Sequence, residues 1–329
     1  MTRAMRRFLV LLAAVVLPLA LVPGWSGEER LALLGPGGTM TATRVAIDPG
    51  DPARTRVGRL RYLGGVALRS DDPAFGGFSS LLVDGDAFTL LSDGGNVVRF
   101  RMSDDWRPRG VRFSFLPSGP RTGWEKRDCD AESMARDPAT GRIWVGFEDA
   151  NQIWRYSPGF GPAERMVRPG VMRRWRGGGG IESFTRLADG RFVAIAEQPR
   201  RGRTGRDGIV WQRDPTLVRP SLRFSYRPTP GYDPSDMTQL PDGRLMVLER
   251  ALGLPFRWYA RLVIVDPSRI RQGASVAGQT IARLAPPLLT DNFEGVAATR
   301  EDGRTIVWLV SDDNEMVLQR TLLMKFALE

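Results

Sequence analysis

Residues 290–314 read TDNFEGVAATREDGRTIVWLVSDDN, and this stretch contains the pattern that decides the fold. A short apolar run begins after Glu294, the chain reverses at Asp302-Gly303, and a β-rich run ends at Asp312. Asp-Gly between two such runs predicts a hairpin, because the tight turn requires positive φ. The two open ends of a hairpin lie on the same side, so Glu294 and Asp312 are expected to lie near each other.

The same unit occurs five times along the chain, each time as a polar residue, a short apolar run, a glycine turn and a β-rich run. The polar residues that open the units are separated by 53, 50, 54 and 58 residues, and they are Ser79, Glu132, Glu182, Asp236 and Glu294. Further β-rich runs lie between the copies. Four short strands in a period of about 50 residues are typical of a β-propeller blade. The sequence therefore predicts an all-β propeller with five blades, or six if a degenerate unit lies within residues 28–70.

The fifth unit needs a strand from elsewhere in the chain, because only residues 316–328 follow it. Residues 57–70, VGRLRYLGGVALRS, have β character and can supply the missing outer strand. Such a closure joins the two ends of the chain and leaves no exposed sheet edge. We expect the propeller to span residues 57–329, after a linker or wrapping segment over residues 24–56.

Residues 1–23 have the features of an export signal. Arg3, Arg6 and Arg7 precede an apolar run that extends to Val22 and is broken only by Pro18. A basic start before about 15 apolar residues is typical of a secretory signal, whereas a spanning helix needs about 20. An uncleaved membrane anchor is the alternative. Either reading predicts a periplasmic or secreted bacterial protein that touches a membrane only through an uncleaved N-terminal segment.

The composition excludes several kinds of chemistry. The 329 residues include no histidine and a single cysteine, Cys129. Ser-His-Asp and Cys-His catalysis, His-ligated zinc and an intrachain disulfide are therefore excluded. The net charge of +10 comes from scattered arginines without a nucleic-acid-binding motif, so we expect no nucleic-acid partner. The charge is compatible with a small anionic or ester substrate, and we expect a monomer.

The repeat places acids at both open ends of the inner hairpins. The pairs are Glu132 with Glu148, Glu182 with Glu197, Asp236 with Glu249, and Glu294 with Asp312, while the first copy has Asp93 beside Ser79. Gathered at one mouth of the axial channel, these carboxylates repel one another unless a cation neutralises them or some stay protonated. Oxygen ligands without nitrogen or sulfur favour Ca²⁺ or Mg²⁺. The predicted ligands are Glu132, Glu182, Asp236, Glu294, Asp93, Glu148 and Asp312. Alternatively, each acid accepts hydrogen bonds from the next blade and stabilises blade packing.

Five short motifs also carry a family resemblance. They are FGGFS at 75–79, DAES at 130–133, GIES at 180–183, PSDM at 234–237 and DNFEG at 291–295. Their order and spacing resemble the phytase-like family with esterase-like activity, which consists of exported bacterial proteins, over roughly residues 56–329. The resemblance implies a propeller that hydrolyses phosphate or carboxylic esters. The run DDPA at 71–74 is similar to an acidic motif of calcium-dependent phytase propellers.

Two functional hypotheses follow. In the first, the protein is a metal-dependent hydrolase of phosphate or carboxylic esters, or of lactones. Glu197 or Glu249 would act as the general base, and Arg127 or Arg250 would bind anionic oxygens. In the second, the propeller is not catalytic and binds a ligand or a protein partner in the cell envelope, because propellers host both kinds of function. Acids satisfied by backbone amides would favour the second hypothesis.

Overall fold

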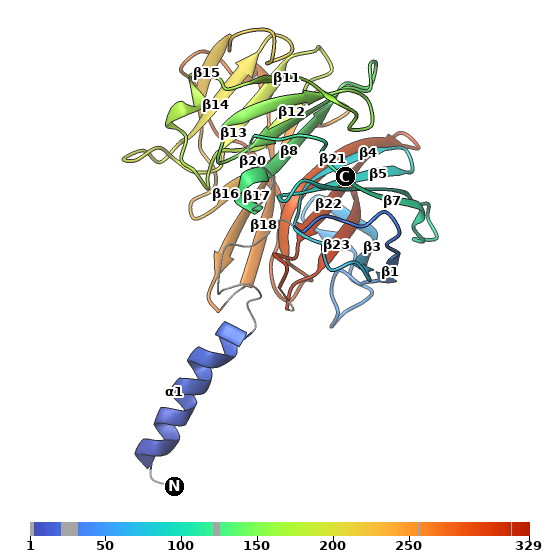
Figure 1. The fold of residues 1–329 in the computed structure, drawn as a ribbon, viewed down its shortest axis with the longest axis vertical. Coiled ribbons are helices and arrows are strands. Elements are labelled where there is room, and N and C mark those ends of the chain that lie inside the picture. Colours follow the sequence, from blue (N-terminus) through green and yellow to red (C-terminus); the bar gives the residue numbers. More distant parts are fainter. Residues whose placement is uncertain (1–2, 21–31, 121–125, 256, 317) are drawn as a thin grey trace.

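The computed structural model describes residues 3–20, 32–120, 126–255, 257–316 and 318–329. Within these residues, five β-sheets surround a common axis (Figure 1). The helical elements are α1 (Arg3–Ala20), α2 (Lys126–Cys129) and the 3₁₀ turns η1 (Met172–Arg174) and η2 (Pro267–Arg269). No helix in this part of the chain is both long and apolar enough to cross a membrane.

Each sheet forms one blade, and in four of them the strands follow the chain from the axis outward. The first blade contains β4 (Phe78–Asp84), β5 (Ala87–Ser92), β6 (Asn96–Arg101) and β7 (Arg109–Phe115). The second contains β8 (Ala131–Arg136), β9 (Ile143–Phe147), β10 (Gln152–Tyr156) and β11 (Ala163–Val167). The third contains β12 (Ile181–Arg186), β13 (Phe192–Ala196), β14 (Arg206–Trp211), β15 (Leu222–Tyr226) and the short β19 (Ser275–Val276). The fourth contains β16 (Asp233–Gln239), β17 (Leu245–Gly253), β18 (Arg257–Val265) and β20 (Gln279–Leu284).

The last blade joins the two ends of the chain. It contains β21 (Asn292–Glu301), β22 (Arg304–Asp312), β23 (Thr321–Leu328), β3 (Leu60–Ser70) and β1 (Met40–Arg44), with β2 (Arg56–Val57) paired to β3. Figure 1 shows β23, β3 and β1 side by side. The predicted five-bladed propeller, closed by an N-terminal strand, is therefore confirmed. The strand β1 lies in the segment that the sequence analysis assigned to a linker or wrapping segment.

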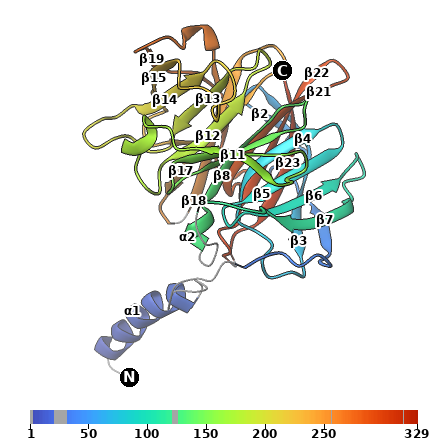
Figure 2. The ribbon, with the colours of Figure 1, turned by 45° about the horizontal axis from the view of Figure 1, so that its top comes forward.

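The ring is held together by its innermost strands and by apolar layers between the blades. The strands β4, β8, β12, β16 and β21 each contact the next, and β21 contacts β4, so the last blade lies beside the first (Figure 2). Five buried apolar clusters fill the contacts between neighbouring blades. Between the last blade and the first, Trp308 packs edge-on against Phe88 with ring centroids 4.8 Å apart. Burial of these apolar side chains stabilises the ring.

Closure by β3 depends on apolar contacts that one substitution can remove. Phe326 of β23 is fully buried, and its ring centroid lies 5.4 Å from that of Tyr62 on β3. Replacing Phe326 with alanine is expected to lower the free energy of unfolding by about 3–5 kcal/mol, measured in urea. The control Leu318→Ala removes a side chain that is 74% exposed, and we expect a change of at most about 0.5 kcal/mol. Equal losses in the two variants would contradict this role of the closing strand.

Candidate metal and active site at the propeller axis

Each innermost strand carries a β-bulge near its start, where one residue has no partner on the second strand of the blade. A bulge leaves its extra residue unpaired and re-aims the side chain. The bulged residues are Ser79, Glu132, Glu182, Ser235 and Glu294. The carboxylates of Glu132, Glu182 and Glu294 are close enough to repel one another. The bulges therefore gather acids from separate blades at one end of the axis.

A second group of side chains comes from the ends of the second strands. In each blade, the residue just before the bulge pairs with a residue near the end of the second strand. The residue that follows this partner along the second strand belongs to the group. Its members are Asp93, Glu148, Glu197, Arg250 and Asp312. The first, second, third and last blades thus each contribute an acid, whereas the fourth blade contributes an arginine.

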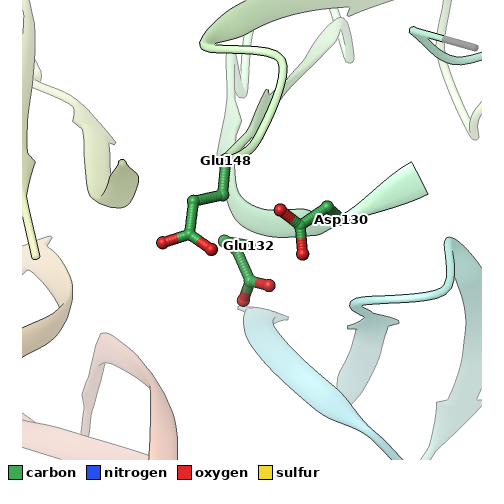
Figure 3. A group of neighbouring side chains, drawn as sticks. All are labelled: Asp130, Glu132 and Glu148. Carbon is green, nitrogen blue, oxygen red and sulfur yellow. The ribbon is translucent and has the colours of Figure 1, made fainter. Parts of the chain in front are cut away.

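Three carboxylates of the second blade converge beside the axis. Figure 3 shows Asp130, Glu132 and Glu148 turned toward one another, and one oxygen from each lies within 4.8 Å of the others. A second group with the same spacing consists of Glu148, Glu182 and Glu197. Glu148 belongs to both groups, and its Oε1 accepts a hydrogen bond of 2.8 Å from Gly180 N. These oxygens form a donor set that fits a hard divalent cation.

Arg250 neutralises the acids on the other side of the axis. Its Nη1 donates to Glu294 Oε1 and, at 2.8 Å, to Asn292 Oδ1. Its Nη2 donates to Glu197 Oε1 at 3.1 Å, and the same atom lies 3.9 Å from Glu182 Oε2. The guanidinium thus connects acids from the third and last blades. Asp130 and Glu132 form no ion pair among the described residues.

Burial and mutual repulsion raise the pKa values of these acids. Burial, followed by repulsion from the neighbouring Asp130, raises the pKa of Glu148 to about 8, although the hydrogen bond from Gly180 N acts in the opposite direction. Burial also raises the pKa of Asp130 to about 6. The pKa of Glu132 is raised well above its ordinary value, first by burial and then by Glu182. The acids on this side of the axis cannot all be charged near pH 7 unless a cation neutralises them.

Asp93 and Asp312 complete the acidic end of the channel. Asp93 Oδ1 accepts a hydrogen bond of 2.6 Å from Gly94 N. Asp312 Oδ1 accepts one of 2.6 Å from Asn314 N, and its Oδ2 lies 3.4 Å from Asn292 Nδ2. Burial, followed by repulsion from Glu294 and Asp93, raises the pKa of Asp312 well above its ordinary value. Both side chains lie where the sequence placed them, and their role as ligands stays a prediction.

Two of the predicted site residues lie away from this cluster. Asp236 is 3% exposed, and its carboxylate accepts hydrogen bonds of 2.7 Å from Met237 N and from Val296 N on the last blade. Glu249 is fully buried and accepts hydrogen bonds from the Tyr226 hydroxyl at 2.6 Å and from Thr229 N at 3.2 Å. The structure therefore does not bring Asp236 and Glu249 to the axial acids. The side chain of Arg127 lies outside the described residues.

Asp236 and Glu249 lie away from the axial acids because the register of the fourth blade differs by one residue from the expected register. The bulge there falls on Ser235, and the matching residue of β17 is Arg250, because Pro234 pairs with Glu249. A shift of one residue turns every side chain of a strand to the opposite face. The fourth blade therefore presents Ser235 and Arg250 to the site, where Asp236 and Glu249 were expected.

Two polar residues of the site are missing from the sequence prediction. Asp130 and Asn292 each lie two residues before a bulged glutamate, and Asn292 Nδ2 donates to Glu294 Oε1 at 2.6 Å. Asp130 has a positive φ of 47° and accepts a hydrogen bond of 2.8 Å at Oδ2 from Asp149 N. A polar residue two positions before the acid, which occurs in the second and fifth copies of the repeat, is the sequence signal that could have identified them.

The fold and this cluster define a five-bladed β-propeller with an acidic site at one end of its axis. A sequence model of the phytase-like family, described as "Esterase-like activity of phytase", matches residues 73–315. The chain belongs to this family, as its motifs predicted. A search of curated proteins found no match.

Solved structures with a related fold have low sequence identity to the chain. Glutaminyl cyclase from Myxococcus xanthus is 13% identical, with a TM-score of 0.45, and the match covers 77% of this chain and 92% of that chain. An α-L-arabinofuranosidase from Podospora anserina, in complex with cellotriose, is 10% identical, with a TM-score of 0.46. That match covers 87% of this chain and 97% of the arabinofuranosidase.

Proposed function

We propose that the protein is an exported, metal-dependent hydrolase that acts on phosphate or carboxylic esters, with lactones as a variant. The observation that carries the proposal is the buried group of Asp130, Glu132 and Glu148, whose oxygens lie within 4.8 Å of one another. Family membership supports hydrolysis, because the family is described by an esterase-like activity. The basic and apolar start of the sequence supports export to the periplasm or beyond.

The residues that would hold the cation are Asp130, Glu132 and Glu148, with Glu182 beside them. Their all-oxygen donor set suits Ca²⁺ or Mg²⁺ better than a softer metal. When bound, such an ion polarises an ester or phosphoryl oxygen and lowers the pKa of a coordinated water. Asp93 and Asp312 extend the negative field around the site and complete the proposed ligand region.

Glu197 is our candidate for the general base. Its side chain is 12% exposed and lies beside Glu148 and Glu182, within reach of water at the channel mouth. Glu197 Oε1 accepts a hydrogen bond of 3.1 Å from Arg250 Nη2, which holds the carboxyl group in place beside the site, and a general base must be held within reach of the proton that it accepts. Arg250 itself donates to acids through both terminal nitrogens, so we assign it a positioning role on Glu197 and Glu294. This revises the sequence hypothesis that Arg250 binds the substrate directly.

Glu132→Gln tests this proposal because it removes one charge from the triad while preserving the side-chain volume. We expect hydrolysis of p-nitrophenyl phosphate, p-nitrophenyl acetate or phytate by the wild type, with at least about a hundredfold loss in the variant and on addition of a chelator. The control Asp302→Asn changes an exposed turn residue with positive φ, a conformation that asparagine tolerates, and should keep full activity.

Two outcomes would contradict the hydrolase proposal. Turnover that survives both Glu132→Gln and the chelator would exclude a metal-dependent reaction at these acids. No turnover of any of the three substrates, with a melting temperature that still falls on chelation, would favour the non-catalytic propeller with structural calcium. The backbone partners of Asp236 already fit the blade-packing role in that second hypothesis.

A further inference from the structure

A second concave site lies at the outer edge of the propeller, between the second and third blades. A cavity of about 520 Å³ is lined by the end of β11, the turn before η1, the loop at 215–220 and the start of β15. Its volume lies in the range of small-molecule pockets, which is about 300–1,000 Å³. These elements do not include the innermost strands, so the cavity is separate from the axial acids.

The cavity carries three positive charges without a compensating acid. Arg168, Arg219 and Arg223 line it, and the lining includes no aspartate or glutamate. Within the described part of the chain, none of the three forms an ion pair. The nearest acids in the sequence are already paired: Glu164 with Arg142 at 2.9 Å and Arg155 at 2.8 Å, and Asp214 with Arg155 at 2.5 Å. The three guanidinium groups therefore keep their donors for a ligand.

The wall beside these arginines is apolar. Val167, Val171 and Val218 line the cavity and pack against the buried cluster that contains Trp211. Trp211 also lines the cavity, is fully buried, and has an indole N–H without a hydrogen-bond partner among the described residues. The surface suits a ligand with both an anionic head and an apolar body.

We propose that this cavity binds a small organic oxyanion, in which a phosphoryl or carboxyl head group is attached to an apolar body of about ring size. Arginine is the side chain best suited to the head group, because its planar fork donates two parallel hydrogen bonds to an oxyanion. The valines would cover the body of the ligand. This binding site is independent of the proposed hydrolytic site and would remain if the axial acids proved non-catalytic.

Calorimetric titration of the full chain with phenylphosphonate, benzoate and inorganic phosphate tests this site. Phenylphosphonate has a P–C bond in place of an ester, so the proposed hydrolase activity would not consume it. We expect phenylphosphonate to bind more tightly than inorganic phosphate, because the valines contribute. The benzoate titration distinguishes a carboxyl from a phosphoryl preference. The double variant Arg219→Gln/Arg223→Gln should weaken binding of the preferred probe at least about tenfold.

Matched controls separate this site from non-specific attraction and from the axial acids. Arg69→Gln/Arg112→Gln removes two exposed arginines outside the cavity and should leave the affinity unchanged. Glu132→Gln should also leave it unchanged, even if that variant abolishes hydrolysis. Equal weakening by the two double variants would overturn the proposal, because binding would then follow net charge alone. Failure of all three probes to bind at about 10 mM would also overturn it.

Discussion

Replacing Arg250 with glutamine should lower the free energy of unfolding by about 3–5 kcal/mol at pH 8 in the presence of a chelator. The substitution leaves Glu294 and Glu197 without the guanidinium that now binds them, and Glu182 without its nearest positive charge. A buried charge that has lost its partner is not solvated by water, so the substitution raises the free energy of the folded state. Urea unfolding followed by tryptophan fluorescence measures the loss.

The control for this prediction is Arg244→Gln. Arg244 pairs with Asp242 at 2.6 Å in a surface turn, and the two side chains are 37% and 45% exposed. Exposed pairs of this kind contribute at most about 1 kcal/mol. Similar losses in the Arg250 and Arg244 variants would show that the axial arginine does not neutralise buried acids. A loss in Arg250→Gln that shrinks at pH 5 would support the assignment, because protonated acids need no partner.

The architecture could be predicted because the repeat recurs in features that the geometry of a blade requires. The glycine turns, which are Asp-Gly in four of the five copies, and the apolar runs recur with nearly constant spacing, and each blade needs both to form its inner hairpin. The closing strand was also predictable, since the fifth copy lacks an outer strand and an open sheet edge is unfavourable. Glu132, Glu182 and Glu294 occupy equivalent positions in the repeat, and they were therefore correctly placed at one end of the axis.

The fourth blade could not be placed correctly from its acids alone. In each copy a buried apolar side chain lies two positions after the bulged residue, and in this copy that side chain is Met237, which makes Ser235 the bulged residue. Alignment on the nearest acid selected Asp236 and, on the next strand, Glu249. Alternate residues of a strand face opposite sides of the sheet. The one-residue error in register therefore also placed Arg250 on the wrong face, so its pairing with the axial acids was not predicted. The buried apolar residues of a strand, whose positions are constrained by packing, therefore indicate its register better than its acidic residues do.

Stability in a chelator is expected to fall as the pH rises from 5.5 to 8.5. Glu148 has an ordinary pKa of 4.5 and a folded-state pKa of about 8, so within this range the folded state binds more protons than the unfolded state. The free energy of unfolding then decreases with rising pH. At about 1.36 kcal/mol per pKa unit, Glu148 and Asp130 together should contribute a decrease of about 3 kcal/mol or more.

A divalent cation should remove most of this pH dependence. Deprotonated carboxylates bind the ion and protonated ones do not, so stabilisation by Ca²⁺ should grow with pH and reach about 2.7 kcal/mol at a concentration one hundred times Kd. The variant Glu148→Gln removes the acid shared by both groups of carboxylates while its amide can still accept the hydrogen bond from Gly180 N. In a chelator at pH 8.5 this variant should be more stable than the wild type, and it should gain little from Ca²⁺. Wild-type stability that rises with pH in the chelator, or an equal gain from Ca²⁺ in the two proteins, would exclude these acids as the cation site. The unequal gains of the two proteins from Ca²⁺ therefore separate a bound ion from shared protons, which are the two ways in which so many buried carboxylates can be accommodated.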